Sequence, residues 1–162
     1  MVDDTIDTGT DHPHNHLDTD PTGVPTHEVE YDGITRIDSY DFDGDGHVDM
    51  WTYDSDGNGR PEITAHDTDD DGQFDVIQYD WNENGTSEGY SRDTDHDGHL
   101  DVHATDQNEN GNPELVITDT DHDGRLDRWD YDRNDDGQID DSQHDTDGDG
   151  QPDLRTTAHA RL

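Results

Sequence analysis

The chain has 162 residues, of which 46 are acidic and 8 are basic, so its formal net charge is -38. Hydrophobic residues make up only 23% of it, about half the share of an ordinary globular domain, which excludes a conventional apolar core. The negative charge excludes nucleic acids and anionic membranes as natural partners and favours cations. The chain has no cysteine, which excludes disulfides and thiolate metal sites.

Residues 1–27 are acidic and contain Thr and Pro, and we predict a disordered tail there. His12, His14 and His16 stand at alternate positions in this tail and are a candidate site for a transition metal, although no scaffold fixes them. No apolar stretch is long enough for a membrane helix, and the acidic start does not resemble a secretory signal. We therefore expect no membrane insertion and no export signal within these residues.

A repeat of 13 residues organises the rest of the chain. Residues 28–40 are a degenerate first unit, in which Asp32 and Gly33 are in register and Arg36 replaces an acid. Nine regular units follow over residues 41–157 without insertion or deletion, and residues 158–162 end the chain. Each regular unit reads Dx[DN]x[DN]Gxx[DE] and then has four variable residues. Halophilic acidity would scatter acids along the chain and does not explain this phase.

The spacing within each unit is typical of a site for a hard cation. Side-chain oxygens at places 1, 3 and 5 of a tight loop converge, place 7 offers a carbonyl, and glycine at place 6 permits the sharp turn. Because place 12 is not regularly acidic, the acid at place 9 must complete the site. The predicted metal ligands, loop by loop, are Asp41, Asp43, Asp45, Asp49; Asp54, Asp56, Asn58, Glu62; Asp67, Asp69, Asp71, Asp75; Asp80, Asn82, Asn84, Glu88; Asp93, Asp95, Asp97, Asp101; Asp106, Asn108, Asn110, Glu114; Asp119, Asp121, Asp123, Asp127; Asp132, Asn134, Asp136, Asp140; and Asp145, Asp147, Asp149, Asp153.

The stretches DFDGDGHVD, DTDHDGRLD and DTDGDGQPD resemble the calcium loops of thrombospondin type 3 repeats and, more closely, those of FG-GAP repeat proteins. The resemblance covers residues 41–153 and implies Ca²⁺ as the cofactor, held at places 1, 3, 5 and 9. It consists of the loop alone. The cysteines usual in thrombospondin repeats are absent, an acid at place 12 occurs only as Asp130, and the strand spacing of a propeller blade is missing.

Between the loops, residues alternate as in short strands, and the glycines and Pro61, Pro113 and Pro152 disfavour helices. Places 8, 10 and 12, for example Val48, Met50 and Ala65, are expected to share the one consistently apolar face. Asp-rich loops alternate with Asn-containing ones, so the true period is 26. This predicts an all-β array, preferably a two-sheet β-roll or solenoid with 26 residues per coil. The alternative is an antiparallel meander that is closed or dimerised.

These features predict a calcium-dependent structural or adhesive repeat module that binds up to about nine Ca²⁺ ions and folds when they bind. The alternative is a soluble calcium buffer or a mineral-binding protein. Most carboxylates are accounted for by the loop phase, so we expect no enzyme activity. The expected location is extracellular or at the cell surface, with a cell-surface or matrix protein or a glycan as partner.

Overall fold

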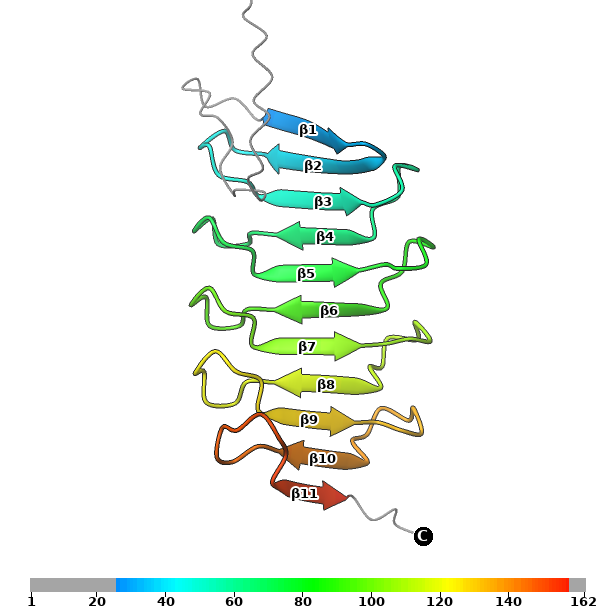
Figure 1. The fold of residues 1–162 in the computed structure, drawn as a ribbon, viewed down its shortest axis with the longest axis vertical. Coiled ribbons are helices and arrows are strands. Elements are labelled where there is room, and N and C mark those ends of the chain that lie inside the picture. The colour runs from blue at the N-terminus through cyan, green and yellow to red at the C-terminus, as the bar shows by residue number, and fades with distance from the viewer. Residues whose placement is uncertain (1–25, 158–162) are drawn as a thin grey trace, which may run out of the picture.

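The structure, a computed structural model, describes residues 26–157, which form one open antiparallel sheet of eleven strands in chain order (Figure 1). The strands are β1 (Thr26–Asp32), β2 (Thr35–Asp41), β3 (Met50–Asp54), β4 (Ile63–His66), β5 (Val76–Tyr79), β6 (Gly89–Arg92), β7 (Val102–Thr105), β8 (Leu115–Thr118), β9 (Arg128–Tyr131), β10 (Asp141–His144) and β11 (Leu154–Thr157). The all-β prediction is confirmed. No helix in residues 26–157 has the length and apolar character needed to cross a membrane.

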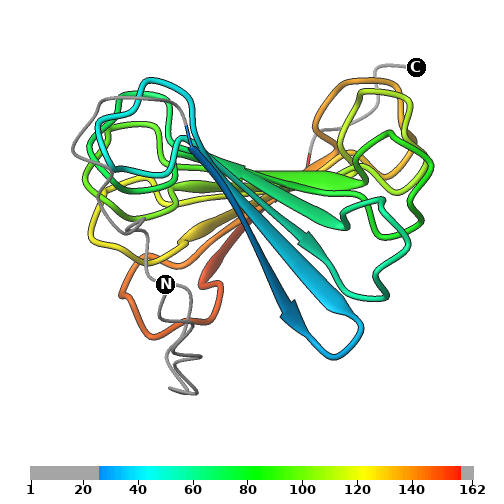
Figure 2. The ribbon, with the colours of Figure 1, turned by 90° about the horizontal axis from the view of Figure 1, so that it is seen from above.

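The preferred β-roll is not the arrangement that the structure shows. In a roll, equivalent strands of successive coils stack in parallel, whereas here every strand pairs antiparallel with its neighbour in sequence, as β4 does with β5. The reason lies in the loop, which returns the chain beside the strand it has just left: the N–H of Asp49, at the loop's end, donates to the carbonyl of Tyr40 in β2 at 2.8 Å. Seen from above, the strands fan out with the usual sheet twist, and the loops stand at their two ends (Figure 2).

The first two strands form a simple hairpin. β1 and β2 pair along their whole length, with Asp32 opposite Thr35. Gly33, at φ +75°, makes the turn that connects them. The degenerate unit at 28–40 is therefore a hairpin with a short turn, and its first strand begins at Thr26, inside the range assigned to the tail. Residues 1–25, with the histidine cluster, and residues 158–162 lie outside the described part of the chain.

The register places residues on the two faces differently from the expected pattern. Trp51 of β3 lies opposite Ala65 of β4, and Ala65 lies opposite Ile77 of β5. Place 12 of one strand therefore meets place 11 of its neighbours, because successive strands of an odd-length repeat present opposite sides to the same face. Places 10 and 12 share a face within one strand, but the expectation that places 8, 10 and 12 of all units form one common face was wrong. One face, which we call the aromatic face, instead contains Trp51, Tyr53, Ile63, Ala65, Ile77, Tyr79, Leu115, Ile117, Trp129 and Tyr131.

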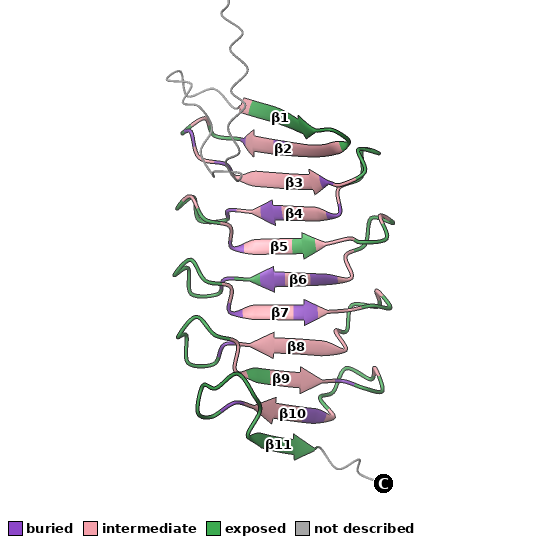
Figure 3. Ribbon diagram, viewed as in Figure 1, coloured by how far each residue is buried: buried purple, intermediate pink, exposed green. Residues whose placement is uncertain are grey.

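The buried residues are mostly acids. Among the described residues only Val48, Ala65 and Ala104 are buried hydrophobics. The buried polar residues are Asp38, Asp41, Asp54, Glu62, Asp67, Asp75, Ser91, Asp93, Asp101, Asp119, Asp132, Asp141 and Asp145. Figure 3 shows that much of this buried chain lies where strands meet loops. Because the sheet is one layer thick, no second layer covers its faces and no large apolar side chain is fully buried among the described residues. The most buried side chains are instead mainly carboxylates at the loop junctions.

A polar chain crosses the aromatic face at its middle. Tyr79 Oη lies 3.1 Å from Ser91 Oγ, which lies 2.5 Å from His103 Nδ1. These residues come from β5, β6 and β7. Ser91 is fully buried, and desolvation lowers the pKa of His103 below its ordinary value. The imidazole is therefore neutral at pH 7 and completes a satisfied hydrogen-bond network between three strands.

Candidate metal sites in two rows of loops

The nine loops form two rows at opposite ends of the strands (Figure 1). The loops that connect β2 to β3, β4 to β5, β6 to β7, β8 to β9 and β10 to β11 begin at residues 41, 67, 93, 119 and 145. These Asp-rich loops are the Asp row. The loops beginning at residues 54, 80, 106 and 132 are the Asn row. Like loops thus lie on the same side, as the 26-residue period predicts.

The place-1 aspartate organises each loop from its start. In all nine loops one of its carboxylate oxygens accepts a hydrogen bond from the backbone N–H of the place-6 glycine. In the central loop, Gly98 N donates to Asp93 Oδ2 at 2.8 Å. Gly98 has φ +89°, a conformation that side-chain-bearing residues rarely adopt. The positive φ at place 6 therefore explains why this position is glycine in every unit.

Backbone hydrogen bonds favour the charged form of the place-1 carboxylate at Asp119 and Asp145. Burial acts to raise the pKa of Asp119, but hydrogen bonds from Gly124, His122 and their neighbours outweigh it, and the net pKa is lowered. The same balance lowers the pKa of Asp145. Place 1 is buried in seven loops, whereas Asp80 and Asp106 are only half-buried. Buried carboxylates that accept backbone hydrogen bonds are thus built into seven of the nine loops.

The place-9 acid closes each loop from its end. Its carboxylate accepts a hydrogen bond from the backbone N–H of place 2 in every loop. Asp75, for example, accepts from Thr68 N at 2.6 Å. Burial acts to raise the pKa of Asp75, while the hydrogen bonds from Thr68 and His96 lower it, with a net decrease. In this loop the ionised form of the place-9 carboxylate is thus favoured.

Places 3 and 5 complete the loop from the solvent side, because their side chains are exposed in all nine loops. Oxygens of Asp67, Asp69 and Asp71 lie within 4.8 Å of one another, as do those of Asp41, Asp43 and Asp45. In these two loops the structure therefore brings places 1, 3 and 5 together. This arrangement presents several carboxylate oxygens to one small volume, which suits a cation.

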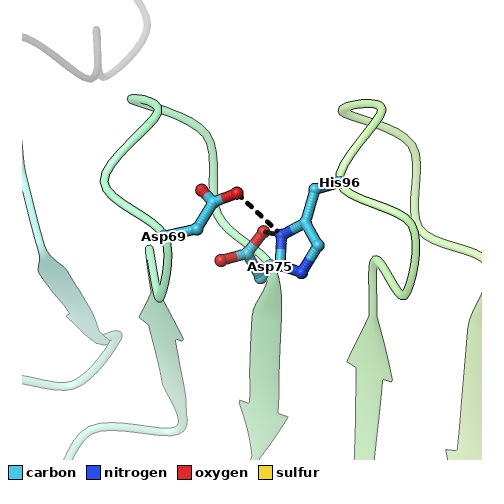
Figure 4. A group of neighbouring side chains, drawn as sticks. All are labelled: Asp69, Asp75 and His96. Carbon is cyan, nitrogen blue, oxygen red and sulfur yellow. Dashed lines mark hydrogen bonds and ion pairs between the residues drawn. The ribbon is translucent and has the colours of Figure 1, made fainter.

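The structure also shows contacts that reasoning within one loop missed. In five loops the place-4 side chain reaches back to the preceding loop of the same row. His96 Nδ1 lies 3.0 Å from Asp69 Oδ2 and 2.9 Å from Asp75 Oδ1 (Figure 4). Its hydrogen bond to Asp75, with the charges of Asp75, Asp69 and Asp93, raises the pKa of His96. This contact could have been expected from the 26-residue spacing of loops in one row, which places the loop of His96 next to the loop at 67–75.

Neighbouring loops of a row are joined by their backbones as well. The N–H of place 1 donates to the carbonyl of place 9 of the preceding loop in the row, as Asp93 N does to Asp75 O at 2.8 Å. This bond occurs at Asp67, Asp80, Asp93, Asp106, Asp119, Asp132 and Asp145. Each candidate site is therefore anchored to the next one.

No protein-family model, curated protein or solved structure matches the chain. The resemblance to thrombospondin type 3 and FG-GAP calcium loops thus rests on the loop motif alone. What the geometry supports directly is nine acidic loops in two rows, several of which bring together groups that could hold a metal ion.

Proposed function

We propose that this chain is a calcium-dependent structural or adhesive repeat module in which up to nine bound Ca²⁺ ions act as the core. The observation that carries the proposal is the nature of the buried residues. Within residues 26–157 the buried hydrophobics are one valine and two alanines, while the buried polar residues other than Ser91 are all acids. Buried carboxylates are costly unless they are paired. With only 8 basic residues in the chain, bound cations are the partners that can offset most of this charge.

The ligand chemistry favours calcium among common cations. The ligand set at places 1, 3, 5 and 9 consists of carboxylate and amide oxygens. Ca²⁺ takes six to eight oxygens in flexible geometry, whereas Mg²⁺ requires a stricter octahedron and retains water. The backbone hydrogen bonds to places 1 and 9 pre-arrange two acids per loop. The exposed places 3 and 5 can then close over an ion that enters from solvent.

The adhesive part of the proposal rests on the open sheet. Trp51 and Tyr53 lie side by side on the aromatic face, with ring centroids 6.0 Å apart. We propose that such a face meets a cell-surface or matrix protein or a glycan outside the cell, where free calcium is abundant enough to fill the loops. No catalytic step is part of this function.

A calcium titration tests the proposal against the alternative of a buffer. The full chain would be titrated with Ca²⁺, following bound ion by calorimetry and strand content by circular dichroism. A structural array gives binding that coincides with a cooperative gain of strand signal, since ions and fold form together. Binding of calcium with no change in strand content would support the buffer and contradict the structural module, and absence of binding would contradict both.

A further inference from the structure

Place-4 side chains contact candidate metal ligands of the preceding loop in the same row. These contacts occur in both rows. Asn84 Nδ2 donates to Glu109 Oε2 at 2.6 Å, and Asn110 Nδ2 donates to Asp135 Oδ2 at 2.6 Å. In each pair a place-4 acid reaches the place-5 residue of the preceding loop in its row. Place 4 therefore belongs in space to the loop before it.

One of these side chains has an unused ligand atom. Asp135 Oδ2 is occupied by Asn108 and Asn110, whereas Asp135 Oδ1 is buried and has no hydrogen-bond partner among the described residues. A buried carboxylate oxygen without a partner is costly. A cation in the loop that begins at Asp106 would satisfy it.

In two loops of the Asp row, those beginning at Asp93 and Asp119, place 4 is a histidine. His96 Nδ1 contacts Asp69 and Asp75 at 3.0 and 2.9 Å, and His122 Nδ1 contacts Asp95 and Asp101 at 2.9 and 3.3 Å. Each trio combines place 3 and place 9 of one loop with place 4 of the next, and its ligand atoms lie within 4.8 Å of one another. Ligand atoms bound to one zinc ion at about 2.0–2.2 Å lie about 3–3.5 Å apart. The nitrogen–oxygen distances of 2.9–3.3 Å are those of hydrogen-bonded ion pairs, and a small outward shift would let the same three atoms share one metal ion.

We propose that the loops beginning at Asp67 and Asp93 hold mixed imidazole–carboxylate sites that bind a first-row transition-metal ion such as Zn²⁺, with His96 and His122 supplied by the following loops. This rests on the proposed function, because it takes the same loops as cation sites and changes the ion at two of them. The physical reason is ligand type: Ca²⁺ takes oxygen ligands, whereas imidazole with carboxylate suits zinc and its neighbours. Each of these ions also joins two loops of the row.

The test uses the full chain in saturating Ca²⁺ with added Zn²⁺. Bound zinc is measured by equilibrium dialysis for the wild type, His96→Ala, His122→Ala and the double variant. We expect each single variant to lose one zinc ion and the double variant to lose two. Zinc held by the histidines of residues 1–25 is common to all four proteins and cancels in the difference. His99→Ala is the matched control, because His99 lies in the same loop as His96 but outside both trios.

Amide NMR assigns each ion to a loop. In the wild type, Zn²⁺ should shift the Gly72 amide, and His96→Ala should abolish that shift although His96 lies in the next loop. The Gly98 amide, in the loop of His96 itself, should instead depend on His122. A third variant, His96→Glu, supplies oxygen as Glu83 and Glu109 do, and should replace the zinc ion at Gly72 by calcium while the fold is kept.

The outcomes separate the two proposals. Unchanged zinc stoichiometry in the double variant, or a His96→Ala effect at Gly98 and not at Gly72, would overturn the mixed sites and leave the calcium array intact. If calcium neither binds nor folds the chain, the proposed function fails whatever zinc does.

Discussion

The backbone N–H of Asp67 donates a 2.9 Å hydrogen bond to the carbonyl oxygen of Asp49, which ends the preceding loop of the Asp row. Two loops separated by a whole strand pair are therefore tied directly to each other. Damage to one loop should reach its row neighbours before it reaches the opposite row. The array also has two ends, so a central loop matters more than a terminal one.

Replacing Gly98 by valine tests this linear organisation. Gly98 has φ +89°, and a Cβ there would meet Oε1 of Gln73 in the preceding loop of the row. We expect a cost of about 1–3 kcal/mol from the strained backbone, loss of the local ion and two separately melting halves. Calorimetric unfolding and calcium stoichiometry measure these effects.

Gly150→Val is the matched control. Gly150 has φ +86°, but a Cβ there meets nothing within 4 Å and its loop is the last in the row. We expect only the final unit to fray and one ion to be lost. Equal damage from both variants would argue against a linear array.

The loops should differ in calcium affinity. Asp-row loops carry acids at places 1, 3, 5 and 9, and ligand charge raises affinity. The loops beginning at Asp80 and Asp106 should be weakest, because each has two motif carboxylates and a place-1 aspartate that is only half-buried. Crystallographic occupancies at partial calcium saturation measure the order, and equal filling of both rows would contradict it.

Place-4 acids of the Asn row assist the preceding loop of the row and not their own. Glu83 lies near Asp56 and Glu62 of the preceding loop, so it does not complete the loop in which it stands. Glu109 instead contacts Asn82 and Asn84. Glu109→Gln should therefore weaken the loop beginning at Asp80 more than its own.

The last strand should detach in acid. Arg155 binds Asp141 through Nη2 at 2.6 Å, and Arg133 lies 3.1 Å from the same carboxylate. Mainly the Arg155 hydrogen bond lowers the pKa of Asp141 from 3.8 to about 2. A lowered pKa stabilises the fold above the unfolded value, so this contribution is complete above about pH 4 and is lost as the pH falls toward 2.

Hydrogen exchange of the β11 amides measures this effect. Arg155→Ala should raise exchange in β11 already at pH 7, whereas Arg60→Ala, which removes an exposed arginine of the Asn row, should leave it unchanged. If β11 exchange in the wild type is the same at pH 5 and pH 2, the Asp141 pair does not hold this strand.

The loops could be predicted from the sequence, whereas the order, direction and register in which the strands pair could not. Asp93, Gly98 and Asp101 each have a role within nine residues, so their spacing alone indicates the loop. Roll and meander share the same strand pattern, and the choice depends on closure bonds such as Asp49 to Tyr40. The pairing of Trp51 with Ala65 and the reach of His96 to Asp75 depend on register between strands, which the motif does not encode.

The central claim is that bound calcium takes the place of an apolar core, and amide NMR of the chelated protein tests it most directly. Without divalent ions the net charge of -38 is not offset, and the few buried hydrophobics cannot hold the sheet together. We predict collapsed amide dispersion and loss of strand signals on chelation, with recovery when calcium is restored. Sharp, dispersed amide signals from β3 to β10 in the chelated protein would contradict the account.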